Sequence, residues 1–260
     1  MSADSGMSHG ELPPVLIERV LEGFGFAAPP PVDLAGLTTL YRAWCRKVPF
    51  DNLRKRIHLH GGSSSVFPGD SAEDFFGGWL RYRTGGTCWA GNGALCTLLA
   101  ALGFPARRGI ATMLARPNIP PNHGTVVVEF DGTLYIIDAS MLHSEPLRLA
   151  IAAPTAIDHP AWGVNAEPRE GQWHIRWRPV NLPTGMDCRI ETLDATRAEF
   201  SERHEATRGW GPFNFEIHAR LIRGDSMLGT CFGRRVELDA HGAVIERTVD
   251  REEQKRMLID

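Results

Sequence analysis

Two glycines and a cysteine stand directly before an apolar run in Thr84-Gly85-Gly86-Thr87-Cys88-Trp89-Ala90-Gly91-Asn92. The run continues at helical spacing and stops at Gly103, which predicts a buried helix with Cys88 in its first turn. Gly85 and Gly86 permit the tight backbone turn that such a helix start needs. A helix N-terminus has partial positive charge and unpaired N–H groups, which favour a thiolate and would hold an oxyanion.

A lone cysteine in this position is otherwise a small apolar residue of a core helix, so chemistry at Cys88 requires partners. Two β-rich runs around Asp131-Gly132 are the strongest short-range signal of a hairpin. With these two turn residues, counting outward places Asp138 opposite Thr125. His123 then lies on the same face and diagonal to Asp138, within reach of it. The spacing predicts a carboxylate–imidazole pair, and with Cys88 it gives a nucleophile, a base and an orienting group.

Two other groups of polar side chains require an interpretation. His143 is an alternative base, but it lies beyond the hairpin and has no evident carboxylate partner. A basic cluster is expected to be a solvated face, with attraction of coenzyme phosphates or of an acidic carrier protein as the alternative. Its members are Arg54, Lys55, Arg56, His58 and His60.

The composition limits the class of protein. A chain of 260 residues with 43% hydrophobic and 23% charged residues is typical of a globular protein of one to three subdomains. A net charge of −3 argues against nucleic-acid binding, and no apolar run approaches the roughly 20 residues of a membrane helix. Five scattered cysteines indicate a reducing cytoplasm, and without a CxxC or a His-rich cluster we expect no metal site.

Four motifs follow one another in the chain: Val48-Pro49-Phe50-Asp51-Asn52-Leu53, Gly85-Gly86-Thr87-Cys88-Trp89, His123 before the hairpin, and Asp138-Ala139 after it. By these motifs the chain resembles the arylamine N-acetyltransferase family, whose members belong with the transglutaminase-like Cys-His-Asp enzymes. The resemblance covers nearly the whole chain. Residues 17–20 are similar to the family's opening helix, and residues 208–213, the Gly224-Asp225 turn and residues 247–258 are similar to its C-terminal region.

The resemblance implies an α+β fold. Residues 1–84 would form a helical N-terminal subdomain, residues 85–185 a β-barrel-like middle subdomain that carries the three candidate catalytic residues, and residues 186–260 an α/β lid. The implied activity is N-acyl transfer. An acyl group would pass from a coenzyme A thioester, through an acyl-cysteine, to a small-molecule amine, without a metal.

The resemblance also suggests which residues contact substrate. In the family the phenylalanine of the first motif lines the acyl and acceptor pocket, a role that would fall to Phe50. On the residues alone, packing is an equally good interpretation of Phe50. The full set of substrate-binding candidates is Phe50, Trp89, Gly124, Met141 and Phe213.

The chain departs from the family pattern at two positions around the cysteine. Thr84 stands where the family has arginine, and Ala90 where it has glutamate. The buried charge network of the family is therefore altered here. We expect a reduced network formed by Arg19, Asp51 and Arg83.

A third departure concerns the amine pocket. Asp138 is followed by Ala139-Ser140-Met141-Leu142, where the family has a Gly-Phe-Gly segment that shapes this pocket. Simple acetylation of arylamines is therefore disfavoured, and a different amine or a longer acyl chain is favoured. The donor would be acyl-CoA or, as in amide synthases of antibiotic assembly, an acyl or peptidyl carrier protein, with a specialised metabolite as the product.

Two other classes of function use the same residues. A cysteine hydrolase or thioesterase would have water as the acceptor, and Cys-His-Asp alone does not distinguish it from a transferase. A non-catalytic descendant would only bind a ligand or a partner, which the intact set of three residues argues against.

Overall fold

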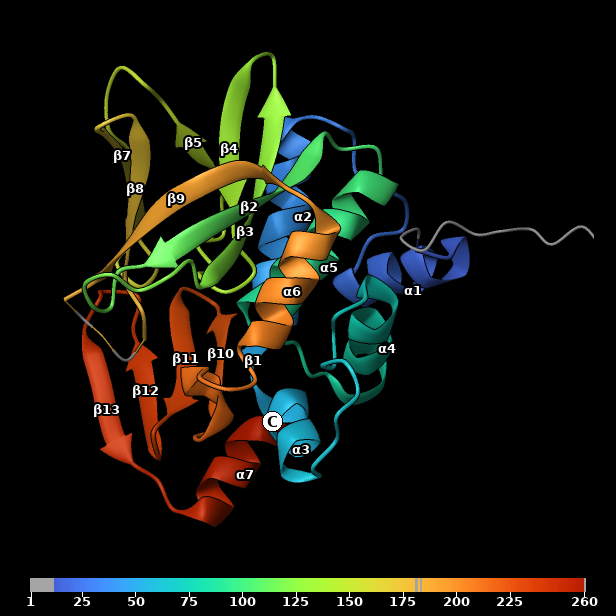
Figure 1. Ribbon diagram of the computed structural model, residues 1–260, viewed down its shortest axis with the longest axis vertical. Coiled ribbons are helices and arrows are strands. Elements are labelled where there is room, and N and C mark those ends of the chain that lie inside the picture. Colours follow the sequence, from blue (N-terminus) through green and yellow to red (C-terminus); the bar gives the residue numbers. More distant parts are fainter. Residues whose placement is uncertain (1–11, 181, 183, 260) are drawn as a thin grey trace, which may run out of the picture.

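The computed structural model describes residues 12–180, 182 and 184–259, which form seven α-helices, one 3₁₀ helix and two antiparallel sheets. In Figure 1 the larger sheet lies above the smaller one, and most helices lie to one side of the two. The helices are α1 (Pro14–Phe24), α2 (Leu34–Lys47), α3 (Leu53–His60), α4 (Ala72–Tyr82), α5 (Cys88–Ala101), α6 (Arg197–Ala206), η1 (Pro212–Asn214) and α7 (Arg251–Ile259).

The larger sheet has eight strands. Their order is β5 (Leu147–Leu149), β4 (Thr133–Ile137), β3 (His123–Phe130), β2 (Ala106–Met113), β9 (Met186–Ala195), β8 (Gln172–Trp177), β7 (Val164–Arg169) and β6 (Thr155–Ile157). The two edge strands approach each other, and the Thr155 hydroxyl donates a hydrogen bond to the carbonyl of Arg148 between them. The sheet is therefore nearly closed, as the expected barrel-like subdomain requires.

The smaller sheet joins segments that are far apart in the sequence. Its order is β1 (Phe50–Asp51), β10 (His218–Arg223), β11 (Ser226–Cys231), β12 (Arg234–Leu238) and β13 (Val244–Thr248). The predicted fold class, helices with a barrel-like sheet and a C-terminal α/β region, is confirmed. The division at residues 84 and 185 stays a prediction, and two strand pairings join residues on opposite sides of its boundaries, β1 with β10 and β9 with β2.

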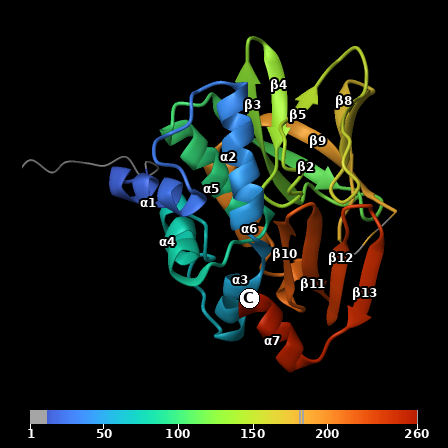
Figure 2. The same cartoon turned by 180° about the vertical axis from the view of Figure 1, so that it is seen from behind.

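Helix α5 is the central helix of the molecule and begins at Cys88, as the glycines predict. Ten of its fourteen residues are buried, because it packs against β2 and β3 and against α4 and α6 (Figures 1 and 2). Such a helix is apolar around its whole circumference. Gly85 permits the chain to enter it, since a Cβ there would lie 1.8 Å from the carbonyl oxygen of Pro49.

The hairpin has the predicted register. Phe130 pairs with Thr133 and Val126 pairs with Ile137. Both turn residues are in the left-handed region, with φ of 49° at Asp131 and 71° at Gly132, as a two-residue turn of type I′ requires. Because strand positions alternate between the two faces, this register fixes the side of the sheet on which His123 and Asp138 lie.

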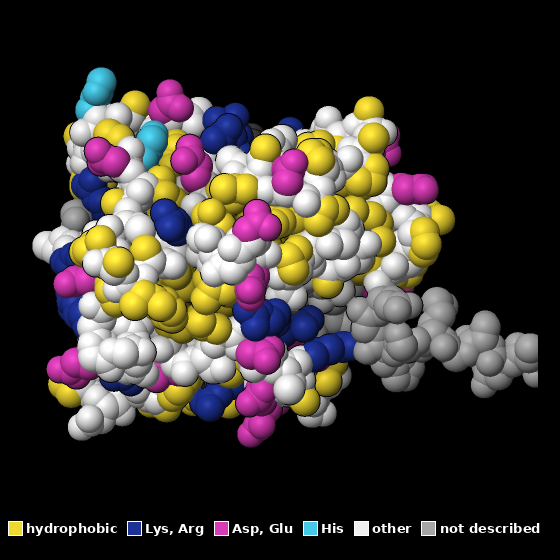
Figure 3. All heavy atoms as spheres, turned by 90° about the horizontal axis from the view of Figure 1, so that it is seen from above, with side chains coloured by type: hydrophobic (Ala, Val, Ile, Leu, Met, Phe, Trp, Pro, Cys, Tyr) yellow, Lys and Arg dark blue, Asp and Glu magenta, His cyan; other side chains and the backbone are white. Residues whose placement is uncertain are grey.

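The surface in Figure 3 carries both charge signs. Lysine and arginine side chains are interspersed with aspartate and glutamate among broad apolar areas on this face. No helix within the described residues is long and apolar enough to span a bilayer. All five cysteines are free and buried.

Tyr41 on α2 connects the helical region to the end of the hairpin. Its buried hydroxyl donates to the carbonyl of Asp138 at 2.8 Å and accepts from the N–H groups of Asp138 at 3.1 Å and His143 at 3.2 Å. Three backbone polar groups in the turn after β4 thus depend on one side chain.

We predict that Tyr41→Phe lowers the free energy of unfolding by about 1–3 kcal/mol, because it leaves buried backbone groups without their partner. Urea unfolding measures the change. Tyr82→Phe is the matched control, since Tyr82 is exposed, and there we expect a change of less than about 0.5 kcal/mol. Equal stability of Tyr41→Phe and the wild type would contradict this account.

Candidate active site

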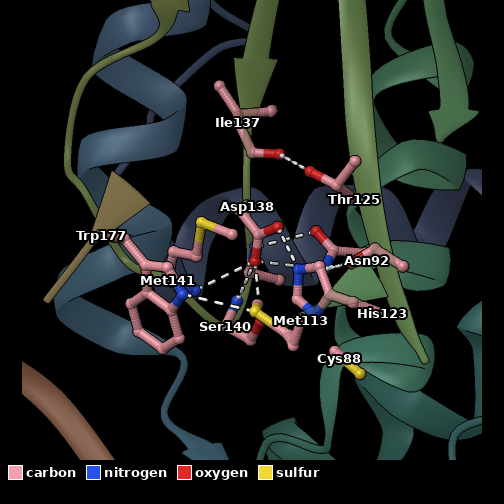
Figure 4. A network of polar contacts seen from close by, with 12 residues as sticks. Cys88, Asn92, Met113, His123, Thr125, Ile137, Asp138, Ser140, Met141 and Trp177 are labelled. Carbon is pink, nitrogen blue, oxygen red and sulfur yellow. Dashed lines mark hydrogen bonds and ion pairs between the residues drawn. The ribbon is translucent and has the colours of Figure 1, made fainter. Parts of the chain in front are cut away.

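The predicted carboxylate–imidazole pair is present at the end of the hairpin. His123 Nε2 lies 2.7 Å from Asp138 Oδ2, and both side chains are buried. Figure 4 shows the His123 ring between Asp138 and Cys88. Because Nε2 is engaged with the carboxylate, Nδ1 is the ring nitrogen left for the thiol.

The second carboxylate oxygen of Asp138 is held by groups from the next turn and from α5. Oδ1 accepts from the N–H of Ser140 at 2.8 Å, from its hydroxyl at 2.7 Å, and from the N–H of Met141 at 3.0 Å. Asn92 adds a contact at 3.3 Å and also binds the carbonyl of Gly124 and the N–H of Ala139. A buried carboxylate with this many donors remains ionised.

The pair shifts the pKa values of both its members. Burial alone would lower the pKa of His123, but the charge and hydrogen bond of Asp138, with the Cys88 sulfur, raise it to about 10. Burial alone would raise the pKa of Asp138, but His123 and the N–H donors hold it well below its usual range. The arrangement therefore favours an imidazolium beside Cys88.

Cys88 is the first residue of α5 and is 7% exposed. Its Sγ lies 3.9 Å from the carbonyl oxygen of Asn122, the residue before His123. The N-cap residue Thr87 makes no side-chain cap hydrogen bond, so the N–H groups of the first turn are not occupied by a capping side chain. The thiol thus lies beside both an imidazole and a helix N-terminus.

These residues open onto a cavity of about 310 Å³. Its lining residues are Phe50, Lys55, Thr87, Cys88, Trp89, Met113, Ala115, Ile119, Asn122, His123, Ser140, Trp177, Pro179, Met186, Thr207, Trp210, Gly211, Pro212, Phe213, His218, Arg220 and Phe232. The wall is mostly apolar and aromatic, as in sites that bind small organic substrates. Asn52, two residues after Phe50, ties this part of the wall to residues 213–218, because its side chain hydrogen-bonds to the backbone of Phe213, Glu216 and His218.

Three of the five substrate-binding candidates line the cavity and two do not. Phe50, Trp89 and Phe213 are part of its wall. Met141 packs instead in the apolar cluster inside the eight-stranded sheet. Gly124 is buried in β3, where a Cβ would lie 2.8 Å from ring atoms of Phe200 and Trp89. Both residues follow a wall residue in sequence, but strand and turn geometry direct them away from the cavity.

The expectation of a solvated basic cluster is wrong for Lys55. This side chain is buried, lines the cavity, and donates from Nζ to the hydroxyl of Thr207 at 2.7 Å. The sequence analysis also missed Arg220, a second cation of the wall, and Asn92. Asn92 had a signal, because it stands four residues after Cys88 and so shares its face of the helix.

His143 is not brought to the cavity. Its Nδ1 lies 2.7 Å from the carbonyl oxygen of Glu145, its ring packs against Tyr41, and burial lowers its pKa to about 4. His123 therefore remains the candidate base.

The expected charge network of Arg19, Asp51 and Arg83 does not form. Both arginines are exposed, whereas Asp51 is buried and accepts from the N–H groups of Gly85 at 2.5 Å and Leu53 at 3.0 Å. Burial raises the pKa of Asp51 to about 6. Asp51 thus holds the glycine turn before Cys88 through backbone donors in place of an arginine.

Metal ligands are not grouped in the part of the chain that the structure describes. No set of three or more histidine, cysteine, aspartate or glutamate side chains there is placed to hold a metal ion.

Comparison with known proteins identifies relatives of this fold. A sequence model described as N-acetyltransferase matches residues 33–174, which is more than half of the chain. No curated protein sequence matches it.

Solved arylamine N-acetyltransferases share the architecture. That of Mycobacterium abscessus is 17% identical, with 93% of this chain and 87% of that chain covered and a TM-score of 0.77. That of Salmonella typhimurium is 17% identical, with 94% and 88% covered and a TM-score of 0.76. That of Mycobacterium marinum, in complex with CoA, is 18% identical, with 93% and 89% covered and a TM-score of 0.76.

We predict that Asp51 makes stability depend on pH. Burial raises its pKa from 3.8, the ordinary value expected in the unfolded chain, to about 6 in the folded protein. Between pH 3.8 and pH 6 the folded state therefore binds more protons than the unfolded state. The contribution of Asp51 to the free energy of unfolding is therefore largest below about pH 4 and falls as the pH rises through 6, by about 3 kcal/mol.

Asp51→Asn removes this titration and keeps an oxygen that can accept from Gly85. Relative to the wild type, we expect the variant to gain about 2.4 kcal/mol between pH 4 and pH 7, the part of the full shift that falls in this interval. Urea unfolding over this range measures the difference, and a difference that is constant with pH would contradict the assignment.

Proposed function

The chain belongs to the arylamine N-acetyltransferase family, and we propose that it moves an acyl group from a coenzyme A thioester, through an acyl-cysteine at Cys88, to an amine. One observation carries the proposal. The His123–Asp138 pair, joined at 2.7 Å, lies beside Cys88 at the wall of a cavity and at the start of a buried helix.

In the first half-reaction the Cys88 proton passes to Nδ1 of His123, and the thiolate attacks the thioester carbonyl. The oxyanion of the tetrahedral intermediate accepts from the N–H groups at the start of α5. As the intermediate collapses, the bond from carbon to the CoA sulfur breaks. His123 returns the proton to that sulfur, so free CoA leaves and the acyl group stays on Cys88.

In the second half-reaction an amine attacks the acyl-cysteine. The Cys88 charge is one cause of the raised pKa of His123. Acylation neutralises the sulfur and so lowers the pKa of the imidazole, which fits it to take a proton from the amine. The amide forms, the bond to Sγ breaks, and the cysteine is regenerated. Asp138 fixes the tautomer of the ring and stabilises its charged form.

The finer substrate proposal concerns the wall of the cavity. Phe50, Trp89 and Phe213 give it an aromatic surface for an apolar or aromatic amine. Of the segment that replaces the family's Gly-Phe-Gly, Ser140 lines the cavity while Met141 packs into the barrel core. We propose that this exchange shifts specificity away from simple arylamine acetylation, with an acyl-CoA or a carrier-bound thioester as the donor.

The first test follows the acyl-enzyme. Incubation with an acyl-CoA in the absence of amine should add one acyl mass to the protein, and peptide mapping should place it on Cys88. Cys88→Ala should abolish the adduct. Cys96→Ala is the matched control, because Cys96 is a buried cysteine of the same helix that does not line the cavity. An adduct elsewhere, with Cys88 unmodified, would overturn the mechanism.

The second test addresses the carboxylate. Asp138→Asn should lower the single-turnover rate of acylation by about 10²–10⁴-fold, because the imidazole loses its orienting charge. Stopped-flow release of CoA thiol measures the rate. An unchanged rate in a folded variant would remove Asp138 from the mechanism.

The third measurement identifies the acceptor and the donor. Product formation is compared with and without amines, and with CoA-bound and carrier-bound thioesters of one acyl group. Amine-dependent amide formation is expected. Release of free acid at the same rate in the absence of amine would indicate a hydrolase instead.

A further inference from the structure

The wall of the cavity carries positive charge. Besides His123, which is paired with Asp138, two cationic side chains line it, Lys55 and Arg220, and none of its described residues is an aspartate or glutamate. Neither cation forms an ion pair with a carboxylate of the described residues. A buried charge without a counter-charge is unfavourable, and one that lines a cavity is a candidate site for a ligand of opposite charge.

Lys55 is the less satisfied of the two. It is 5% exposed, and its ammonium makes one hydrogen bond, to Thr207, of the three it can donate. Nζ also lies 4.8 Å from the centre of the Phe67 ring. The acidic side chain that acts on it, Glu205, is paired with Arg208 at the surface. Burial lowers the pKa of Lys55 to about 8, so the side chain is still mostly charged at neutral pH.

Arg220 is already held on three sides. Its guanidinium lies 4.1 Å from the centre of the Phe50 ring and 5.1 Å from that of Trp177. Two of its nitrogens donate to the carbonyl of Ser140, Nε at 3.0 Å and Nη2 as well. Arg220 therefore fixes the turn that holds Asp138 and adds positive potential to the cavity, whereas Lys55 keeps donors to offer.

We propose that the preferred donor carries a second carboxylate at the far end of its acyl chain, as the monothioester of a dicarboxylic acid, and that Lys55 is the specificity-determining residue that binds this carboxylate. The inference rests on the proposed acyl transfer. The bonds made and broken are those of the acyl-cysteine route, and the distal carboxylate is left unchanged.

Lys55 is deeply buried, which favours a carboxylate on the acyl group over a carboxylate on the amine. The acyl chain is attached to Sγ of Cys88, which is itself buried. Lys55 and Arg220 line the same cavity as Cys88, so both cations face the space in which the acyl group would lie. Trp210 and Phe232, which are 41% and 55% exposed, line the cavity where it meets solvent. The amine, arriving last, meets this aromatic rim first.

The test compares donors that differ in the distal group. Single-turnover acylation of the wild-type enzyme is followed by intact-protein mass spectrometry with succinyl-CoA and with 4-methylpentanoyl-CoA, in which a branched alkyl end replaces the carboxylate. We expect succinyl-CoA to acylate Cys88 about ten- to a hundred-fold faster at limiting donor concentration, the range that one charge-assisted hydrogen bond supplies. Malonyl-CoA and glutaryl-CoA then locate the best chain length.

Lys55→Met keeps the length of the side chain and removes its charge. The ratio of the succinyl rate to the 4-methylpentanoyl rate should fall about ten- to a hundred-fold in this variant, mainly through KM. Lys47→Met is the matched control, because Lys47 is exposed at the end of α2 and outside the cavity, and its ratio should equal that of the wild type. Lys55→Gln replaces Lys55→Met if the latter does not fold.

The outcomes separate this inference from the acyl transfer on which it rests. A wild-type enzyme that is acylated on Cys88 equally fast by both donors overturns the carboxylate specificity and leaves the transferase proposal standing. Equal loss of both rates in Lys55→Met assigns Lys55 a general structural role and also overturns it. If no thioester acylates Cys88, both proposals fail. A paired acceptor series of 4-aminobenzoate and its methyl ester, run with one donor, tests whether the amine carries the carboxylate instead; a carboxylate preference in that series alone overturns the assignment to the acyl group.

Discussion

The ionised carboxylate of Asp138 is the constraint on which the rest of the site depends. A charge removed from water is tolerated only with a counter-charge and a full set of hydrogen-bond donors. Here the counter-charge comes from β3 as His123, and the donors come from the turn after β4 and from Asn92 on α5. The backbone of Asp138 is held in turn by Tyr41 of α2. Helical region, hairpin and turn thus meet at one buried side chain.

This convergence explains why the thiol and the imidazole face each other. The position of Cys88 is set from one side by the glycine turn, whose Gly85 N–H is bound by Asp51, and by the burial of α5 against β3. The position of His123 is set from the other side by the hairpin register and by Asp138. Because Asn92 of α5 also binds Asp138 and the carbonyl of Gly124, helix and hairpin are joined directly beside Cys88 and His123. In the proposed reaction, groups that are held in this way by separate, rigid elements need little reorganisation.

The charges on the cavity wall come from other elements of the fold. The cations have no acidic partner on the wall, and the pairing of Phe50 with Arg220 across β1 and β10 places the guanidinium on an aromatic ring beside Ser140. If the wall selects the donor as we propose, one fold can keep Cys88, His123 and Asp138 and change its donor by the charge of a few wall residues. In this protein those residues come from α3 and β10, outside the elements that carry Cys88, His123 and Asp138.

The local sequence determined the His123–Asp138 pair and the start of the central helix. A two-residue Asp-Gly turn and the two-residue period of a strand suffice to place His123 near Asp138, and glycines before an apolar run suffice to begin a helix at Cys88. Tertiary structure alone decided which cations enter the cavity and which do not. Lys55 is read in sequence as part of a hydrophilic cluster, and Arg220 lies in a strand whose partner is 170 positions earlier, Phe50. Burial and long-range strand pairing depend on how the whole chain packs, and no local pattern contains that information.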